Sequence, residues 1–151
     1  MLHPTQIFMF NPSQQDVRRF FCETFRKYQA KELLTPLETI AADWISQHPE
    51  YAEDLSDVER ALVADYRVDA GKTNPFLHLS MHLTIAEQIT INQPIGVRVA
   101  YEALAHQKNS IHEAHHAMME CLGEMIWNSQ RSNMPPDGQA YIEALNRRAR
   151  K

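Results

Sequence analysis

The chain has 151 residues, of which 44% are hydrophobic and 23% are charged, and its net charge near neutral pH is −4. A chain of this length and composition suits one globular domain that buries its own apolar core. The net charge excludes a general attraction to nucleic acids or anionic membranes, and no apolar run is long enough to predict a membrane-spanning helix.

The N-terminal residues and the two cysteines predict a cytoplasmic protein. Residues 1–10 lack the basic start and the small-residue cleavage site of a signal peptide, so we expect a loose N-terminal arm. Cys22 and Cys121 lie inside helical patterns and do not form a paired framework, which predicts free thiols in a reducing compartment. With only four glycines, the composition favours helices over a turn-rich β fold.

Helix start signals recur along a helical domain expected over residues 11–146. A serine or threonine followed three residues later by an acidic residue predicts a capped helix start. This signal occurs at Ser13, Thr35 and Ser56, and the last of these predicts a helix over residues 56–67. On the first helix, Arg18 belongs to the face that we expect to lie in water.

Two later helices are apolar over most of their circumference, which is typical of buried central helices. The first covers residues 75–90 after Asn74 as its capping residue, and Glu87 is its only charged residue. The second covers residues 110–131 and starts with Ser110 as its cap. The sequence therefore predicts an all-α fold, a compact single-domain bundle of six to seven helices around these two.

Histidines gather on these two apolar helices. His78 and His82 share one face of the first helix, and His112 and His116 share one face of the second, where Glu120 extends the row by a turn. Imidazole and carboxylate groups at this spacing can hold a divalent metal such as Zn, Fe, Mn or Ni. We therefore predict that these residues form a metal site.

Glu124 lies one turn beyond Glu120 and is expected to support the ligands from behind. An open coordination position would allow metal-assisted hydrolysis or redox chemistry. No feature of the sequence selects a substrate, so the question whether the protein is an enzyme stays open.

Two other interpretations account for the same histidines. In one, the protein is a non-enzymatic interaction or regulatory module, and its histidines form a buried polar network with carboxylates such as Glu120. In the other, it is a zinc-dependent hydrolase, because His112-Glu113-Ala114-His115-His116 matches the motif H-E-x-x-H. Against the hydrolase, Glu113 is accounted for as the capping partner of Ser110, and no strand is predicted beside the motif.

Basic residues end the chain in a tail over residues 147–151, which comprises Arg147, Arg148, Arg150 and Lys151. Such a tail can bind nucleic acid or an acidic partner, but cations also suit the end of a helix, where they interact with its dipole. Nucleic-acid binding is therefore a minor alternative, and the sequence does not identify the partner of the protein.

Two segments resemble a known family. They are Asn74-Pro-Phe-Leu-His-Leu-Ser-Met-His-Leu83 and Met119-Glu-Cys-Leu-Gly-Glu-Met-Ile-Trp127, and His48-Pro-Glu-Tyr51 accompanies them. Together they resemble an uncharacterised family of small bacterial proteins, a domain of unknown function, over nearly the whole chain. The resemblance implies one cytoplasmic helical domain and brings no established activity. In outline the fold is also similar to helical histidine–metal bundles such as hemerythrin-like proteins, which does not fix a function.

Overall fold

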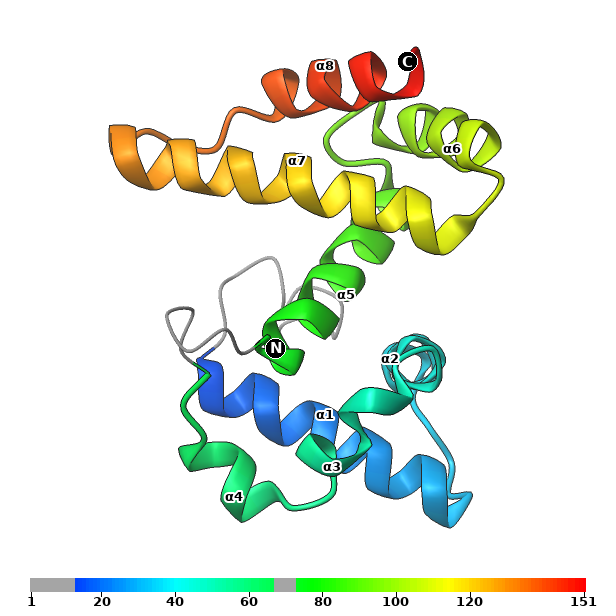
Figure 1. The fold of residues 1–151 in the computed structure, drawn as a ribbon, viewed down its shortest axis with the longest axis vertical. Coiled ribbons are helices and arrows are strands. Elements are labelled where there is room, and N and C mark those ends of the chain that lie inside the picture. Colours follow the sequence, from blue (N-terminus) through cyan, green and yellow to red (C-terminus); the bar gives the residue numbers. More distant parts are fainter. Residues whose placement is uncertain (1–12, 67–72) are drawn as a thin grey trace. The chain divides into compact units, whose positions relative to one another are not determined.

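A computed structural model of the chain describes residues 13–66 and 73–151. In these ranges the chain forms eight α-helices, a short 3-10 helix and no strand (Figure 1). The predicted all-α class is confirmed, with more helices than the six or seven expected, because the four residues Ala52–Leu55 form a helix of their own. The predicted N-terminal arm lies outside the described residues. No helix in the described ranges has the length and apolar character needed to cross a membrane.

The chain divides into two compact units, residues 1–84 and residues 85–151. The boundary falls inside α5 (Pro75–Ile91), so one continuous helix belongs to both units. We refer to them as unit 1 and unit 2.

Unit 1 contains α1 (Gln14–Ala30), α2 (Pro36–Ser46), the 3-10 helix η2 (Pro49–Tyr51), α3 (Ala52–Leu55), α4 (Val58–Val63) and the first half of α5. Helix α1 packs against α2, α3 and α4. These helices bury a common apolar core, which removes its side chains from water and stabilises the unit. The larger members of this core are Phe21, Phe25, Leu37, Trp44, Ile45, Tyr51, Leu55, Phe76, Leu79 and Leu83.

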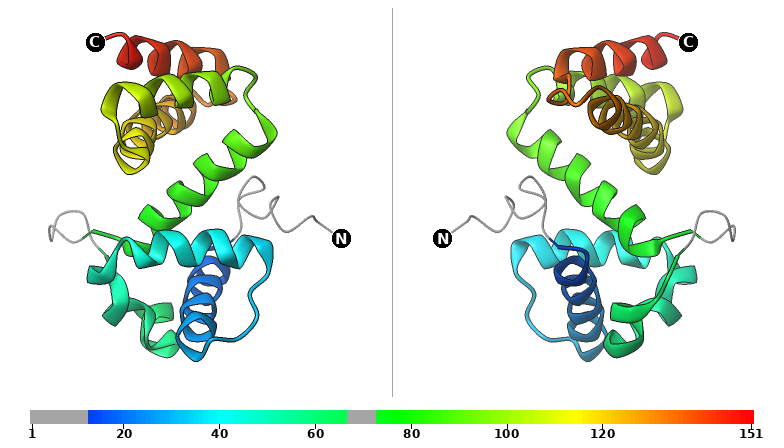
Figure 2. Two further views of the ribbon diagram at one scale, coloured as in Figure 1. Left: turned by 90° about the vertical axis from the view of Figure 1, so that its right-hand side faces the viewer. Right: turned by 90° about the vertical axis from the view of Figure 1, so that its left-hand side faces the viewer.

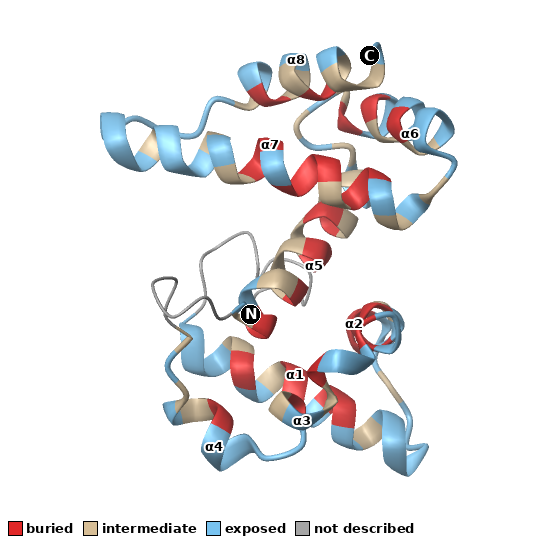
Figure 3. Cartoon of the chain, viewed as in Figure 1, coloured by how far each residue is buried: buried red, intermediate tan, exposed pale blue. Residues whose placement is uncertain are grey.

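Unit 2 contains the second half of α5 together with α6 (Val97–Lys108), α7 (Ile111–Ser132) and α8 (Gly138–Ala149). Helices α6, α7 and α8 each pack against the other two (Figure 2). The first half of α7 is largely buried, whereas its last turns, from Ile126 onward, are largely exposed (Figure 3). Helix α8 continues through Arg147 and Arg148, so most of the predicted basic tail is helical.

Four predicted helix starts are confirmed by their caps. Ser13, Thr35, Asn74 and Ser110 each accept hydrogen bonds from backbone N–H groups of the helical turn that follows them. These N–H groups have no partner within the helix, so the side chains of the capping residues satisfy them and fix where each helix begins.

The predicted start at Ser56 is wrong. The Ser56 hydroxyl donates to the carbonyl oxygen of Glu53 at 2.8 Å, at the end of α3. Asp57 caps α4 instead, because its carboxylate accepts from the backbone N–H of Arg60 at 3.2 Å. Either Ser56 or Asp57 has a side chain that can cap a helix. Because Ser56 is bonded to the preceding turn of α3, Asp57 takes this role.

The expectation that Arg18 lies in water is also wrong, because the residue is 7% exposed. Its Nη1 donates to the carbonyl oxygens of Ala61 at 2.7 Å and Ala64 at 2.8 Å, at the end of α4. The guanidinium carbon also lies 5.4 Å from the ring centroid of Tyr66 and 5.5 Å from that of Phe76. Arg18 therefore joins α1 to α4 in the interior of unit 1.

Candidate metal centre

Three histidines of unit 1 bring their rings together. His78 and His82 lie one turn apart on α5, and His48 directly precedes η2. One ring nitrogen from each histidine lies within 4.8 Å of those from the other two. His48 is 4% exposed, His82 is fully buried and His78 is half-buried. These residues form a compact set of nitrogen donors that is largely shielded from solvent.

The contact of His48 with α2 fixes the tautomer of its neutral ring. Its Nδ1 lies 2.9 Å from the carbonyl oxygen of Trp44. A carbonyl oxygen only accepts, so Nδ1 carries the proton and donates, and Nε2 of the neutral ring holds a lone pair. Backbone carbonyls orient metal-binding histidines in this way, because the bond fixes both the tautomer and the ring plane.

The Nε2 atom of His48 lies 3.1 Å from the Nε2 atom of His78. A metal about 2.1 Å from two nitrogens holds them roughly 3.0–3.4 Å apart, for bond angles between a right angle and the tetrahedral angle. The observed separation therefore suits two ligands of one metal ion. Without a metal, it suits a hydrogen bond in which His78 donates to the lone pair of His48.

Aromatic rings stack on two of these histidines. The Trp44 ring lies parallel to that of His82, with centroids 3.9 Å apart and an angle of 14° between the planes. The Tyr51 ring lies parallel to that of His48, with centroids 5.1 Å apart and an angle of 4°. Both aromatic side chains belong to the segment from α2 to η2, which therefore orients His82 on α5 as well as its own His48.

The predicted ligands on α7 lie in unit 2. The rings of His112 and His116 meet edge to face with centroids 4.4 Å apart, as expected for residues one turn apart. Glu120 is exposed, and its carboxylate lies 2.7 Å from the guanidinium group of Arg148. Glu124 is exposed too. Unit 2 thus brings the two predicted histidines together, while Glu120 forms an ion pair with α8.

The H-E-x-x-H motif occupies the first turns of α7. Glu113 is exposed, and its backbone N–H donates to the Ser110 hydroxyl at 3.1 Å, which confirms Ser110 as the cap of α7. Burial, with smaller contributions from His112 and His116, lowers the pKa of His115 to about 4, so its ring is neutral near pH 7. None of the described residues forms a strand beside the motif.

A family model for a domain of unknown function, DUF1841, matches residues 13–147. The chain belongs to this family. No curated protein and no solved structure matches it. This membership confirms the family resemblance that was inferred from the sequence. Because the family is a domain of unknown function, we infer a function for this DUF1841 chain from the geometry of its residues.

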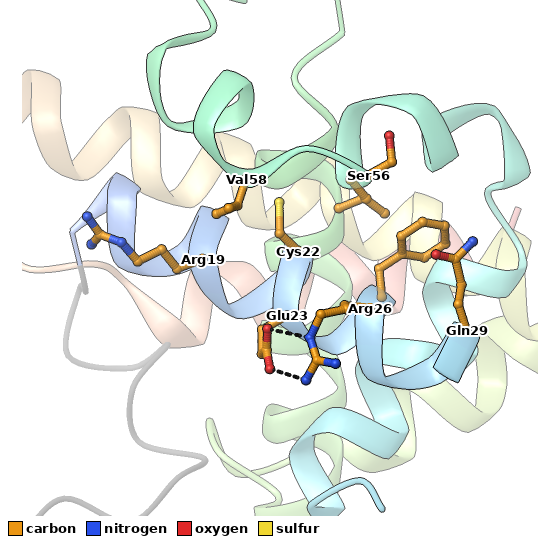
Figure 4. Close-up of a pocket in the computed structure, with 9 residues that line it drawn as sticks. Arg19, Cys22, Glu23, Arg26, Gln29, Ser56 and Val58 are labelled. Carbon is orange, nitrogen blue, oxygen red and sulfur yellow. Dashed lines mark hydrogen bonds and ion pairs between the residues drawn. The ribbon is translucent and has the colours of Figure 1, made fainter. Parts of the chain in front are cut away.

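A pocket of about 320 Å³ in unit 1 of the DUF1841 chain contains none of these histidines (Figure 4). Among its lining residues, two nitrogens of Arg26 donate to the carboxylate of Glu23, at 2.6 and 3.0 Å. Cys22 also lines the pocket, and burial raises the pKa of its thiol to about 11, so it is not a thiolate nucleophile near neutral pH. The thiol of Cys22 therefore gives this pocket no nucleophile near neutral pH.

The sequence predicted His78 and His82 but missed His48 as a member of the site in DUF1841. Helical spacing connects residues on one helix, and His48 stands after the end of a different one. The available signal was the segment His48-Pro-Glu-Tyr51, which places a histidine and an aromatic residue around the turn that follows α2.

Proposed function

We propose that this DUF1841 chain binds a divalent transition metal through His48, His78 and His82. The observation that carries the proposal is the convergence of three ring nitrogens, from two separate elements, within 4.8 Å of one another. The bond from His48 to the Trp44 carbonyl adds support, because it directs Nε2 of His48 toward Nε2 of His78, and in the neutral ring this nitrogen carries the lone pair.

The chemistry of the donors narrows the choice of metal. Neutral imidazoles suit Zn²⁺, Fe²⁺ and Ni²⁺, whereas Mn²⁺ prefers oxygen ligands. Three protein ligands leave room for at least one more, and water in that position would be acidified by the metal. Zn²⁺ is therefore the first metal to test, and hydrolytic or redox chemistry at the open position is a proposal that follows only if metal binds.

Further ligands from α7 remain a prediction from the sequence. The rings of His112 and His116 are in contact, as for any pair one helical turn apart, whereas the Glu120 carboxylate forms an ion pair with Arg148. Alanine substitutions at the two histidines and at Glu120 test this part separately. If His112 or His116 is a ligand, its alanine variant would bind metal more weakly than the wild type. The Glu120→Ala variant is expected to bind metal like the wild type.

Metal content is the direct test of the proposal. We expect untagged wild-type protein to hold about one equivalent of Zn²⁺, and the variants His48→Ala, His78→Ala and His82→Ala to bind at least roughly tenfold more weakly. The measurements are elemental analysis and a Zn²⁺ titration in competition with a chromophoric chelator. His106→Ala is the matched control, since His106 is an exposed histidine on α6.

Less than about a tenth of an equivalent of any metal, with a melting temperature that a chelator does not change, would overturn the proposal.

A second candidate function is a non-enzymatic interaction module whose histidines form a buried polar network. One observation favours it, namely the chain of hydrogen bonds from His78 through His48 to the Trp44 carbonyl. Such a chain satisfies these imidazole groups without a metal. In this case His48→Gln would lower the melting temperature of the protein, and neither the variant nor the wild type would contain metal.

A further inference from the structure

We propose that Trp44 is a positioning residue for this metal centre and that its ring strengthens metal binding by stacking on His82. The inference rests on the proposed function, because it concerns the same three histidines. It adds a residue that donates no atom to the metal and yet acts on its affinity.

Trp44 contacts two of the three histidines in two different ways. Its backbone carbonyl accepts the hydrogen bond from Nδ1 of His48, four residues further along the chain. Its indole ring stacks on His82, which lies on α5. One residue of α2 therefore orients ligands from two separate elements, and the two contacts can be separated because a side-chain substitution leaves the carbonyl in place.

The indole contact favours the metal-bound state for an electrostatic reason. A metal draws electron density from the imidazole that binds it, so the His82 ring becomes partly positive. The face of an aromatic ring carries partial negative charge and attracts cationic groups, and among the aromatic side chains Trp does so most strongly. The stack is therefore stronger with metal than without it, and only such a difference between two states shifts a binding equilibrium.

Tyr51 stands in the same relation to His48, but at a larger distance. Its centroid lies 5.1 Å from that of His48, against 3.9 Å for Trp44 and His82. A tyrosine ring also attracts cations less strongly than an indole. We therefore expect the effect to be concentrated at Trp44.

The test must separate this role from ordinary core packing, because Trp44 is 7% exposed and belongs to the core of unit 1. Phe25 is a matched control: it is 8% exposed, belongs to the same core, and lies on α1. Replacing either residue by leucine removes an aromatic ring from this core, and only the Trp44 substitution removes the ring stacked on a ligand.

The experiment compares Zn²⁺ dissociation constants of full-length wild type, Trp44→Leu, Trp44→Phe and Phe25→Leu, by competition with a chromophoric chelator. We expect Trp44→Leu to weaken binding about five- to tenfold and Trp44→Phe about two- to threefold, in line with the energies of aromatic stacking. Phe25→Leu is expected to bind Zn²⁺ like the wild type, although its metal-free form melts at a lower temperature.

A second readout is the visible absorption of bound Co²⁺, whose ligand-field bands report the orientation of the imidazoles. These bands are expected to shift in both Trp44 variants and to stay in place in Phe25→Leu. If the wild type binds metal and both Trp44 variants bind as tightly as Phe25→Leu, the role of Trp44 is refuted while the metal site stands. If the wild type binds no metal, the proposed function fails and the inference falls with it.

Discussion

Glu87 is a single residue that places a carboxyl group from the apolar helix α5 in the interior of the protein. The residue is 5% exposed, and neither carboxylate oxygen has a hydrogen-bond partner among the described residues. Burial raises its pKa from the ordinary value of 4.5 to about 7. A buried charge without a partner costs free energy, so the group takes up a proton more readily in the folded state than in the unfolded chain.

This difference predicts how stability depends on pH. Between pH 4.5 and 7 the folded state holds the Glu87 proton and the unfolded chain has lost it, so the free energy of unfolding falls as the pH rises. Glu87→Gln removes the ionisation and keeps the shape. At pH 8 this variant is expected to be more stable than the wild type, by about 3 kcal/mol at most, with little difference near pH 4.5. Urea unfolding across this range, with chelator present, measures the effect, and parallel profiles of the two proteins would contradict it.

Arg18 shows how one planar group can hold two helices together. A single nitrogen, Nη1, donates to both carbonyl oxygens at the end of α4, and a lysine ammonium has neither the reach nor the planar stacking surface of the guanidinium group. We expect Arg18→Lys to lower the free energy of unfolding by about 1–3 kcal/mol, because buried carbonyl groups lose charged donors. Arg19→Lys is the control, since the Arg19 side chain is 54% exposed. Equal unfolding midpoints in urea for the two variants would show that the buried contacts contribute nothing.

At the scale of elements, the sequence predicts the helices that carry their own signals. Ser13, Thr35, Asn74 and Ser110 mark their helix starts because capping is a local interaction between residues about three positions apart. The site depends on contacts that are not local. His78 and His82 share a helix and were predicted together, whereas His48 approaches them across 30 positions of the chain. Helical periodicity carries no information about that approach.

The interior position of Arg18 escaped prediction for a similar reason. On α1, Arg18 stands next to charged residues that are exposed to solvent, such as Asp16 and Arg19. The pattern of this helix alone therefore assigns Arg18 to the solvent-exposed face. What buries it is a second element, α4, whose final carbonyl groups need donors. Buried polar contacts of this kind are decided by pairs of elements and not by either sequence segment alone.

For the molecule as a whole, the division into two units inside α5 determines which residues a bound metal would stabilise. The ligands His48, His78 and His82 all belong to residues 1–84. A metal that binds them closes the segment between positions 48 and 78, and binding to the folded state adds stability by mass action. The predicted ligands of α7 belong to residues 85–151, so the extent of the stabilised region depends on whether α7 takes part.

Amide hydrogen exchange measures which helices a bound metal stabilises. With saturating Zn²⁺, we expect slower exchange in α2, η2 and the first half of α5, because local opening of these elements must release the metal. Helices α6 and α8 carry no predicted ligand and are expected to exchange at the same rate with and without metal. Slower exchange in the first turns of α7 would support ligands from His112 or His116, whereas an unchanged α7 would confine the site to unit 1. His82→Ala should abolish the effect of Zn²⁺, and a wild-type protein whose α2 exchanges equally fast with and without Zn²⁺ would contradict the proposed ligand set.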